Sequence, residues 1–192
     1  MLGYDLSHWN SDTQFNECLS NADFIILKAT EGKTWLDSTF EIRMQKVIEK
    51  GIIAGAYHFW NAKKTAEDNA NNFIKAVKPF VKKDCDCNCC EHCGKTEIIL
   101  ALDVENCEAD YDAITNFLDI VEKETGNRPL IYHNLADYKK YRCNERNEKY
   151  WIAAWSWTAG NVIKDNIVIH QYKGSPIDQN YIERKEVLYD FS

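Results

Sequence analysis

Eight short apolar segments recur along the chain, and they limit its fold more than any other feature of the sequence. Most are too short for buried helices and are rich in Ile, Val and aromatic residues, as strands are. The pattern therefore predicts eight strands. The segments are Leu2–Leu6, Phe24–Ala29, Ile52–Phe59, Ile98–Val104, Leu130–Tyr132, Trp151–Trp155, Ile167–Tyr172 and Ile177–Ile182.

Helical patterns separate several of these segments. Apolar residues at helical spacing stop before Gly51, Pro79 and Gly126, which are residue types that end helices. Alternating strands and helices indicate a parallel sheet, and eight strands favour its closure into a barrel. Several connections near the C-terminus are too short for a crossover helix. We therefore expect an α/β fold, an incomplete barrel forming one domain over residues 1–192; an open doubly wound sheet is the alternative.

The net charge argues against nucleic acid as a partner, and the short apolar runs argue against insertion into a membrane. The formal net charge is −7, whereas domains that bind nucleic acid electrostatically are basic. No apolar run approaches the roughly 20 residues that span a bilayer. The first residues also lack the basic stretch and apolar run of a secretory signal. We expect no nucleic-acid partner and no membrane insertion, and either a removed signal or another route out of the cell.

Acidic residues lie at the ends of several predicted strands. Asp5 and Asp103 lie near the ends of their predicted strands, Glu31 and Glu105 come just after strands, and Asp178 lies on the last strand. In barrels of this kind catalytic residues sit at the carboxyl ends of the strands. We therefore expect these acids to converge on one mouth. The alternative is that each of these acidic residues is an ordinary solvent-exposed side chain at the end of a strand.

Asp103-Val104-Glu105 is the most specific pattern in the chain. Residues two apart in a strand share one face, with Cα atoms about 6.6 Å apart. Two acids behind an apolar strand are costly to bury unless they are paired or used. Neighbouring negative charge raises one pKa, so that one carboxyl stays protonated near neutral pH. Cleavage of a glycosidic bond needs this asymmetry, because one acid donates a proton while another stabilises positive charge.

The chain resembles glycoside hydrolase family 25, the Chalaropsis-type lysozymes of bacteria, fungi and phage. The matching stretches follow the order of the family and span almost the whole chain. They are Gly3–Ser7, Phe24–Gly32, Gly51 with Gly55–Phe59, Leu102–Glu105, Pro129–Tyr132, Trp151–Ala153, Gln171–Tyr172 and Ile177–Asn180.

The resemblance implies an irregular TIM-like (β/α)5(β)3 barrel and hydrolysis of peptidoglycan between N-acetylmuramic acid and N-acetylglucosamine. Glu105 would be the general acid/base, and Asp103 would stabilise charge or orient the 2-acetamido group. Asp5 and Asp178 would complete an acidic floor, and Tyr132 would hydrogen-bond the intermediate. The family is regarded as retaining, with the acetamido group as internal nucleophile. No cofactor is needed for this chemistry.

Aromatic residues near the strand ends are candidates for substrate binding. Tyr57 is assigned to the substrate site, and Trp60 and Trp155 are candidates for stacking on sugar rings or for packing; Trp9 is a weaker candidate. His170 replaces a tryptophan that is frequent in the family, which we expect to alter the shape of a subsite.

Other polar residues have structural alternatives. Lys28 and Glu31 would tune the acidic floor or form a structural ion pair, and His58 is expected to be a satisfied buried histidine.

A Cys-rich insertion, Lys82–Lys95, is not a feature of the family pattern. A local set of disulfides, a structural zinc site or free thiols are the alternatives. The insertion precedes the fourth strand, opposite the expected active site, so a structural role is predicted. Its possible ligands or disulfide partners are Cys85, Cys87, Cys89, Cys90, His92 and Cys93.

Three functions are consistent with the sequence. The first is a monomeric lysozyme acting on the bacterial cell wall, either secreted or released as a phage endolysin. The second is a non-catalytic glycan-binding module on the same barrel, which has no need for Glu105. The third is a hydrolase of chitin-like glycans.

Overall fold

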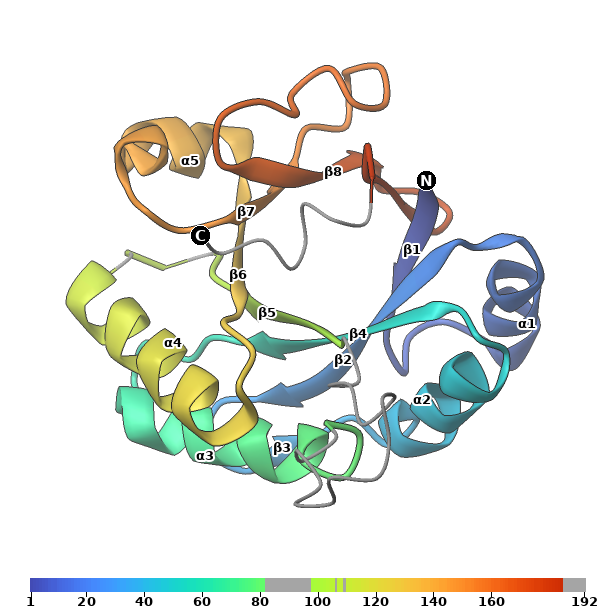
Figure 1. Ribbon diagram of the computed structural model, residues 1–192, viewed down its shortest axis with the longest axis horizontal. Helices are drawn as coiled ribbons and strands as arrows, with labels where there is room; N and C mark the ends of the chain where they lie inside the picture. Colours follow the sequence, from blue (N-terminus) through green and yellow to red (C-terminus); the bar gives the residue numbers. More distant parts are fainter. Residues whose placement is uncertain (82–97, 106, 109, 185–192) are drawn as a thin grey trace, which may run out of the picture.

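A closed ring of eight strands forms the centre of the computed structural model, which describes residues 1–81, 98–105, 107–108 and 110–184 (Figure 1). The order is β1-β9-β8-β7-β6-β5-β4-β2, and β1 pairs with β2 to close the ring; β3 extends β2 at one edge. The open-sheet alternative is therefore excluded. The strands are β1 Leu2–Leu6, β2 Phe24–Glu31, β3 Trp35–Leu36, β4 Ile53–Phe59, β5 Ile99–Asp103, β6 Leu130–Asn134, β7 Tyr150–Ala153, β8 Ile167–Lys173 and β9 Asp178–Tyr181.

In the described part of the chain, five α-helices cover the outside of the ring (Figure 1). They follow β1, the β2–β3 unit, β4, β5 and β6, whereas β7, β8 and β9 succeed one another without an α-helix. This is the predicted (β/α)5(β)3 arrangement. The helices are α1 Asp12–Asn21, α2 Phe40–Glu49, α3 Ala66–Val77, α4 Tyr111–Thr125 and α5 Leu135–Lys140, and a 3-10 turn covers Cys143–Glu145.

The last strand runs opposite to the others. β9 is antiparallel to both β8 and β1, because the short link from β8 leaves no room for the crossover that a parallel pair needs. Asp178 is therefore the first residue of its strand, but it lies directly opposite Asp5 in the register. The hairpin brings Asp178 to the rim where the parallel strands end.

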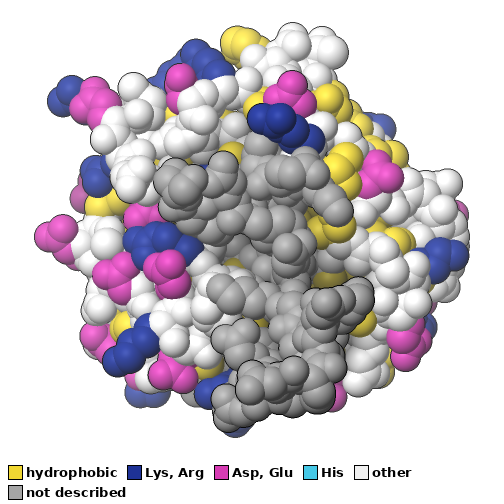
Figure 2. Space-filling model, in the orientation of Figure 1, with side chains coloured by type: hydrophobic (Ala, Val, Ile, Leu, Met, Phe, Trp, Pro, Cys, Tyr) yellow, Lys and Arg dark blue, Asp and Glu magenta, His cyan; other side chains and the backbone are white. Residues whose placement is uncertain are grey.

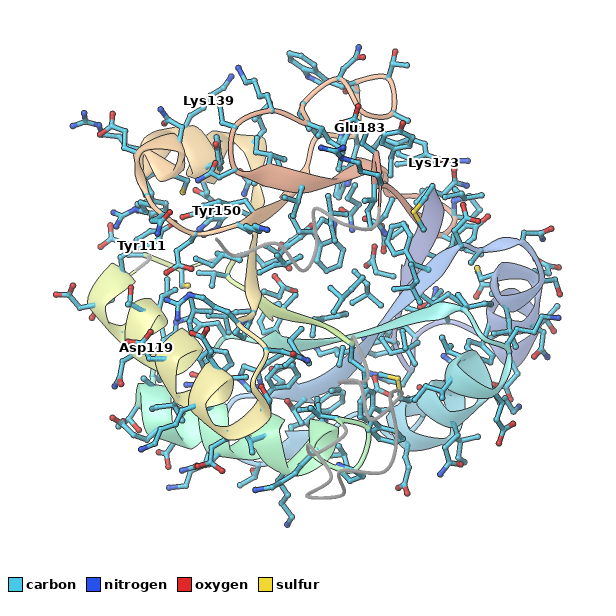
Figure 3. All side chains as sticks on the ribbon, viewed as in Figure 1. Tyr111, Asp119, Lys139, Tyr150, Lys173 and Glu183 are labelled. Carbon is cyan, nitrogen blue, oxygen red and sulfur yellow. The ribbon has the colours of Figure 1, made fainter. Side chains whose placement is uncertain are left out.

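Side-chain alternation on the strands divides the apolar core into two layers. Ile99 and Ala101 of β5 belong to the layer inside the barrel, together with Phe24 and Trp151, whereas Leu100 belongs to the layer shared with the helices. Side chains fill the interior of the ring in Figure 3. The inner layer forms the floor below the acidic residues.

Local sequence signals explain where several helices begin and end. α4 ends at Gly126, whose φ of 75° lies in the left-handed region that glycine adopts readily. α1 starts with a capping box, in which Ser11 and Gln14 each bond the backbone of the other. The apolar pattern alone did not reveal α1 or the short α5.

Charged side chains of both signs are interspersed around the face shown in Figure 2. The acids expected to form the site are instead buried or half-buried within the barrel mouth. No helix in the described part of the chain is long and apolar enough to cross a membrane.

The Cys-rich insertion, with Cys85, Cys87, Cys89, Cys90, His92 and Cys93, lies outside the described residues. In the part that is described, Cys18, Cys107 and Cys143 are free thiols. Among these same residues there is also no group of three His, Cys, Asp or Glu side chains arranged to hold a metal ion.

Candidate active site

An acidic cavity of about 330 Å³ opens at the rim where the parallel strands end. Its lining includes seven of the eight catalytic or substrate-binding residues predicted from the sequence. The lining residues are Asp5, Tyr57, Asp103, Glu105, Tyr132, Trp151, Trp155, Gln171, Gly174 and Asp178. Their convergence follows from the barrel, since these residues come from seven different strands or the segments that follow them.

Asp103 is the most confined acid of the cavity. It ends β5 on the same face as Ile99 and Ala101 and is only 7% exposed. Its Oδ1 atom is buried and has no hydrogen-bond partner among the described residues. Burial raises the pKa of Asp103 well above its ordinary value, and the nearby carboxylates of Glu105 and Asp5 raise it further. Burial and the neighbouring negative charge thus both favour the protonated form of Asp103.

Glu105 lies two residues beyond Asp103 and is half-buried in the same cavity. Burial raises the pKa of Glu105, and the positive charge of Lys28 opposes this shift. Lys28 itself forms an ion pair with Glu31, with 2.9 Å between Nζ and Oε2. Lys28 thus combines the two roles considered from the sequence, because it belongs to an ion pair and also moderates the acids of the cavity.

Gln171 and Asn180 hold Asp5 in place. The Gln171 Nε2 and Asn180 Nδ2 groups donate hydrogen bonds of 2.9 and 2.7 Å to Asp5 Oδ2. Burial raises the pKa of Asp5 to about 6, although these two amides favour its ionised form and lower the pKa. The residue types did not single out Gln171 or Asn180, but a glutamine inside the apolar β8 segment was a usable signal.

Gln171 also connects the acids with the aromatic side of the cavity. Its Oε1 atom accepts hydrogen bonds from Tyr132 OH at 3.0 Å and from Trp155 Nε1 at 2.8 Å. Trp155 is 61% exposed, so one edge of its indole is fixed while much of the ring stays accessible. A Cβ atom at Gly174 would come within 2.8 Å of this ring, so a larger residue there would displace Trp155.

Asp178 faces Asp5 across the β1–β9 pair. Burial raises the pKa of Asp178 to about 7, and the carboxylates of Asp5 and Glu105 add to the shift. Four acids therefore share one cavity, and each has a raised pKa. The arrangement can supply both a proton donor and a negative charge within one site.

The raised pKa values of Asp5 and Asp178 predict that these two acids contribute less to folding stability as pH increases. Asp5 and Asp178 have ordinary values of 3.8 and folded-state values of about 6 and about 7. Between pH 4 and 7 the folded protein therefore binds protons that the unfolded chain has lost, which lowers the unfolding free energy as pH rises. We expect Asp178→Asn to raise Tm at pH 8 by a few degrees, since about 1 kcal/mol shifts Tm by roughly 2–4 °C.

Thermal unfolding followed by circular dichroism at pH 4, 6 and 8 measures this effect. The gain should shrink towards pH 4, where the wild-type Asp178 is protonated. Glu49→Gln, an exposed position on α2, is the control and should show no such trend. A Tm gain from Asp178→Asn that is as large at pH 4 as at pH 8 would contradict the raised pKa of Asp178.

The assignment of Trp60 to the sugar site requires correction, and His170, expected to alter the shape of a subsite, is buried. Trp60 does not line the cavity, because it is 4% exposed and packs edge-on against Phe117 of α4 in the layer between sheet and helices. His170 is fully buried, with its ring bonded to the carbonyl of Ala154 and the amide of Gly160. Neither side chain is available to a sugar.

His58 is the satisfied buried histidine that was expected. Its ring nitrogens bond Thr30 Oγ1 at 2.7 Å and Asn69 Oδ1 at 2.9 Å, and it stacks on Phe117. Burial lowers the pKa of His58 to about 4, so the ring is neutral. Tyr57, its neighbour in the strand, points to the other face and lines the cavity.

A second hydrogen-bonded group lies behind the end of β5, on the side away from the cavity. His133 Nδ1 donates to the carbonyl of Val104, the residue between the two central acids, at 2.8 Å. This tautomer leaves Nε2 to accept from Tyr111 OH at 2.8 Å, and Tyr111 lies 2.9 Å from Cys143 Sγ. In Figure 3 Tyr111 and Tyr150, which lies next to this group on β7, are on the same side of the barrel. The sequence did not indicate this group.

Comparison with curated sequences identifies a relative of this chain. The protein YegX of Escherichia coli K12, itself uncharacterised, is 27% identical over 163 residues, which cover 79% of this chain. The chain spans about half of that relative, 55% of its length.

Two solved structures share the fold. A bacterial lysozyme from Streptomyces coelicolor superposes with a TM-score of 0.77 at 19% identity, covering 100% of this chain and 96% of that one. A muramidase from Acremonium alcalophilum superposes with a TM-score of 0.73 at 22% identity, covering 100% and 98%. The sequence profile described as glycosyl hydrolases family 25 matches residues 4–180. With both the sequence profile and the barrel in agreement, the chain belongs to glycosyl hydrolases family 25.

Proposed function

We propose that this protein hydrolyses peptidoglycan at the β-1,4 bond between N-acetylmuramic acid and N-acetylglucosamine. The observation that carries the proposal is the pair Asp103 and Glu105, which line one acidic cavity in a member of a glycosidase family. The names lysozyme and muramidase of two proteins with the same fold support the choice of substrate.

The first step of the proposed reaction uses the proton on Glu105. The Glu105 carboxyl group donates this proton to the glycosidic oxygen while the bond between C1 and that oxygen breaks. The carbonyl oxygen of the 2-acetamido group attacks C1 from the other face and forms a cyclic oxazolinium ion. The Asp103 carboxylate stabilises the positive charge that develops on the sugar, and this charge in turn favours the ionised form of Asp103.

The second step returns the protein to its starting state. The Glu105 carboxylate removes a proton from a water molecule, whose oxygen attacks C1 and opens the oxazolinium ring. C1 is inverted twice, so its configuration is retained. Tyr132, which is fixed by Gln171, is placed to hydrogen-bond the intermediate.

This function implies where the protein works. Peptidoglycan lies outside the bacterial membrane, so the enzyme acts in the wall, as a secreted protein or as an endolysin released on lysis. The mechanism uses side chains alone, and we propose that it requires no cofactor and that the protein acts as a monomer.

Product analysis on purified walls tests the proposal. The wild-type protein should clear a suspension of walls and release fragments whose new reducing ends are N-acetylmuramic acid. Chitin oligomers of equal length are the control, and hydrolysis of these alone would assign the protein to chitin-like glycans instead. Binding to walls without any new reducing ends would favour a non-catalytic glycan-binding module.

A further inference from the structure

An exposed aromatic cluster lies beside the acidic cavity and has no role in the proposed chemistry. Trp9 is 83% exposed and Trp35 is 39% exposed, and the ring of His8 contacts both. The ring centroids of His8 and Trp9 are 4.5 Å apart, and those of His8 and Trp35 are 5.2 Å apart. We call these three residues the Trp9 cluster. Neighbouring indole rings held in solvent are available to contact a ligand.

Buried charged residues hold the turn that carries Trp9. Arg43 of α2 is 4% exposed and donates hydrogen bonds to the carbonyls of Ser7 at 2.9 Å and Asn10 at 2.7 Å. Asp37 is 2% exposed and accepts bonds of 2.9 Å from both the backbone amide and Nδ1 of His8. The backbone around Trp9 is therefore fixed while its indole stays in solvent, which lowers the entropic cost of binding a ligand.

The Trp9 cluster lies at the same end of the barrel as the acidic cavity. Trp9 follows β1, which carries Asp5, and Trp35 follows the end of β2 at the same rim. Lys28 Nζ lies 4.9 Å from the centre of the Trp35 ring, and the charge of this lysine acts on both Asp103 and Glu105. Trp155 follows β7, which is four strands from β2 around the closed ring. Aromatic side chains thus occupy opposite sides of the mouth.

We propose that the Trp9 cluster is a second carbohydrate subsite, which binds an N-acetylated sugar ring of the glycan strand outside the acidic cavity. This inference rests on the proposed function, since the occupant is the same polymer that is cut. Indole faces match the C–H face of a pyranose ring. His8 uses Nδ1 for Asp37, which leaves Nε2 to hydrogen-bond a hydroxyl or acetamido group of the sugar. The strand then crosses the mouth from the Trp9 cluster towards Trp155.

Chain-length dependence of hydrolysis tests the subsite. Trp9→Ala should lower kcat/KM for long glycan strands about tenfold, mainly through KM, and leave hydrolysis of a tetrasaccharide unchanged. Trp35→Ala should act in the same direction. Ile42→Ala, which removes a 62% exposed apolar side chain from α2, is the control and should leave both substrates unaffected. Equal kcat/KM of Trp9→Ala and wild type on long strands would overturn the proposal.

A binding experiment separates the subsite from the catalytic assignment. In the Glu105→Gln background, chitohexaose should shift the indole N–H signals of Trp9 and Trp35 in a two-dimensional NMR spectrum. These shifts support the subsite even where the wild-type protein fails to cut walls. Shifts confined to Trp155 and Trp157 would overturn it. So would a concentration-dependent dimer that Trp9→Ala abolishes, because that result assigns the surface to a second copy of the chain.

Discussion

Glu105→Gln should reduce wall hydrolysis by at least about a thousandfold, because the side chain acts as acid in one step and base in the next. Glutamine keeps the volume of the side chain and removes the proton that titrates. The expected loss is in kcat, while binding of the glycan should change little. Release of reducing ends from purified walls measures the rate, and sedimentation with walls measures binding.

The matched control for this variant is Glu108→Gln, an exposed acid in the same segment after β5. It should retain wild-type activity. Circular dichroism and thermal unfolding of both variants establish that the barrel is intact. Activity of Glu105→Gln within a few-fold of wild type would remove the basis of the proposed mechanism.

Asp103→Asn should lower kcat by about a hundredfold and at the same time stabilise the fold at neutral pH. Burial raises the pKa of this carboxyl well above its usual range, and asparagine resembles the protonated form that burial favours. Asparagine cannot ionise when positive charge develops on the sugar, which is the step that the carboxylate is proposed to assist. Activity and stability should therefore change in opposite directions.

Steady-state kinetics on soluble glycan strands and thermal unfolding at pH 7 measure the two effects in one protein sample. Comparison with Asp103→Ala separates the effect of charge from the effect of packing. Asparagine removes only the charge, whereas alanine also removes side-chain volume and should lower both activity and Tm. Full activity of Asp103→Asn would mean that Asp103 works in its protonated form, and the proposed stabilisation of charge by its carboxylate would fail.

Local patterns in the sequence were sufficient for the fold class and for the central acids. The alternation along Ile99–Asp103 predicted which face of β5 carries Asp103, because strand geometry depends on neighbours in the chain. The stop at Gly126 and the short links near the C-terminus predicted the end of α4 and the missing helices. Apolar periodicity does not predict α1, which buries only Phe15 and Cys18, although the capping box at Ser11 marks where this helix begins.

Contacts between distant residues were decided only by the tertiary structure. Trp60 was placed at a sugar site because it follows a strand, yet the packing of α4 on β4 turns it into the helical layer against Phe117. Gln171 meets Asp5 and Tyr132 only after the barrel closes, and the antiparallel β9 brings Asp178 opposite Asp5. Sequence periodicity determines which face a side chain occupies, whereas its partners depend on how strands and helices pack, and no local pattern contains that information.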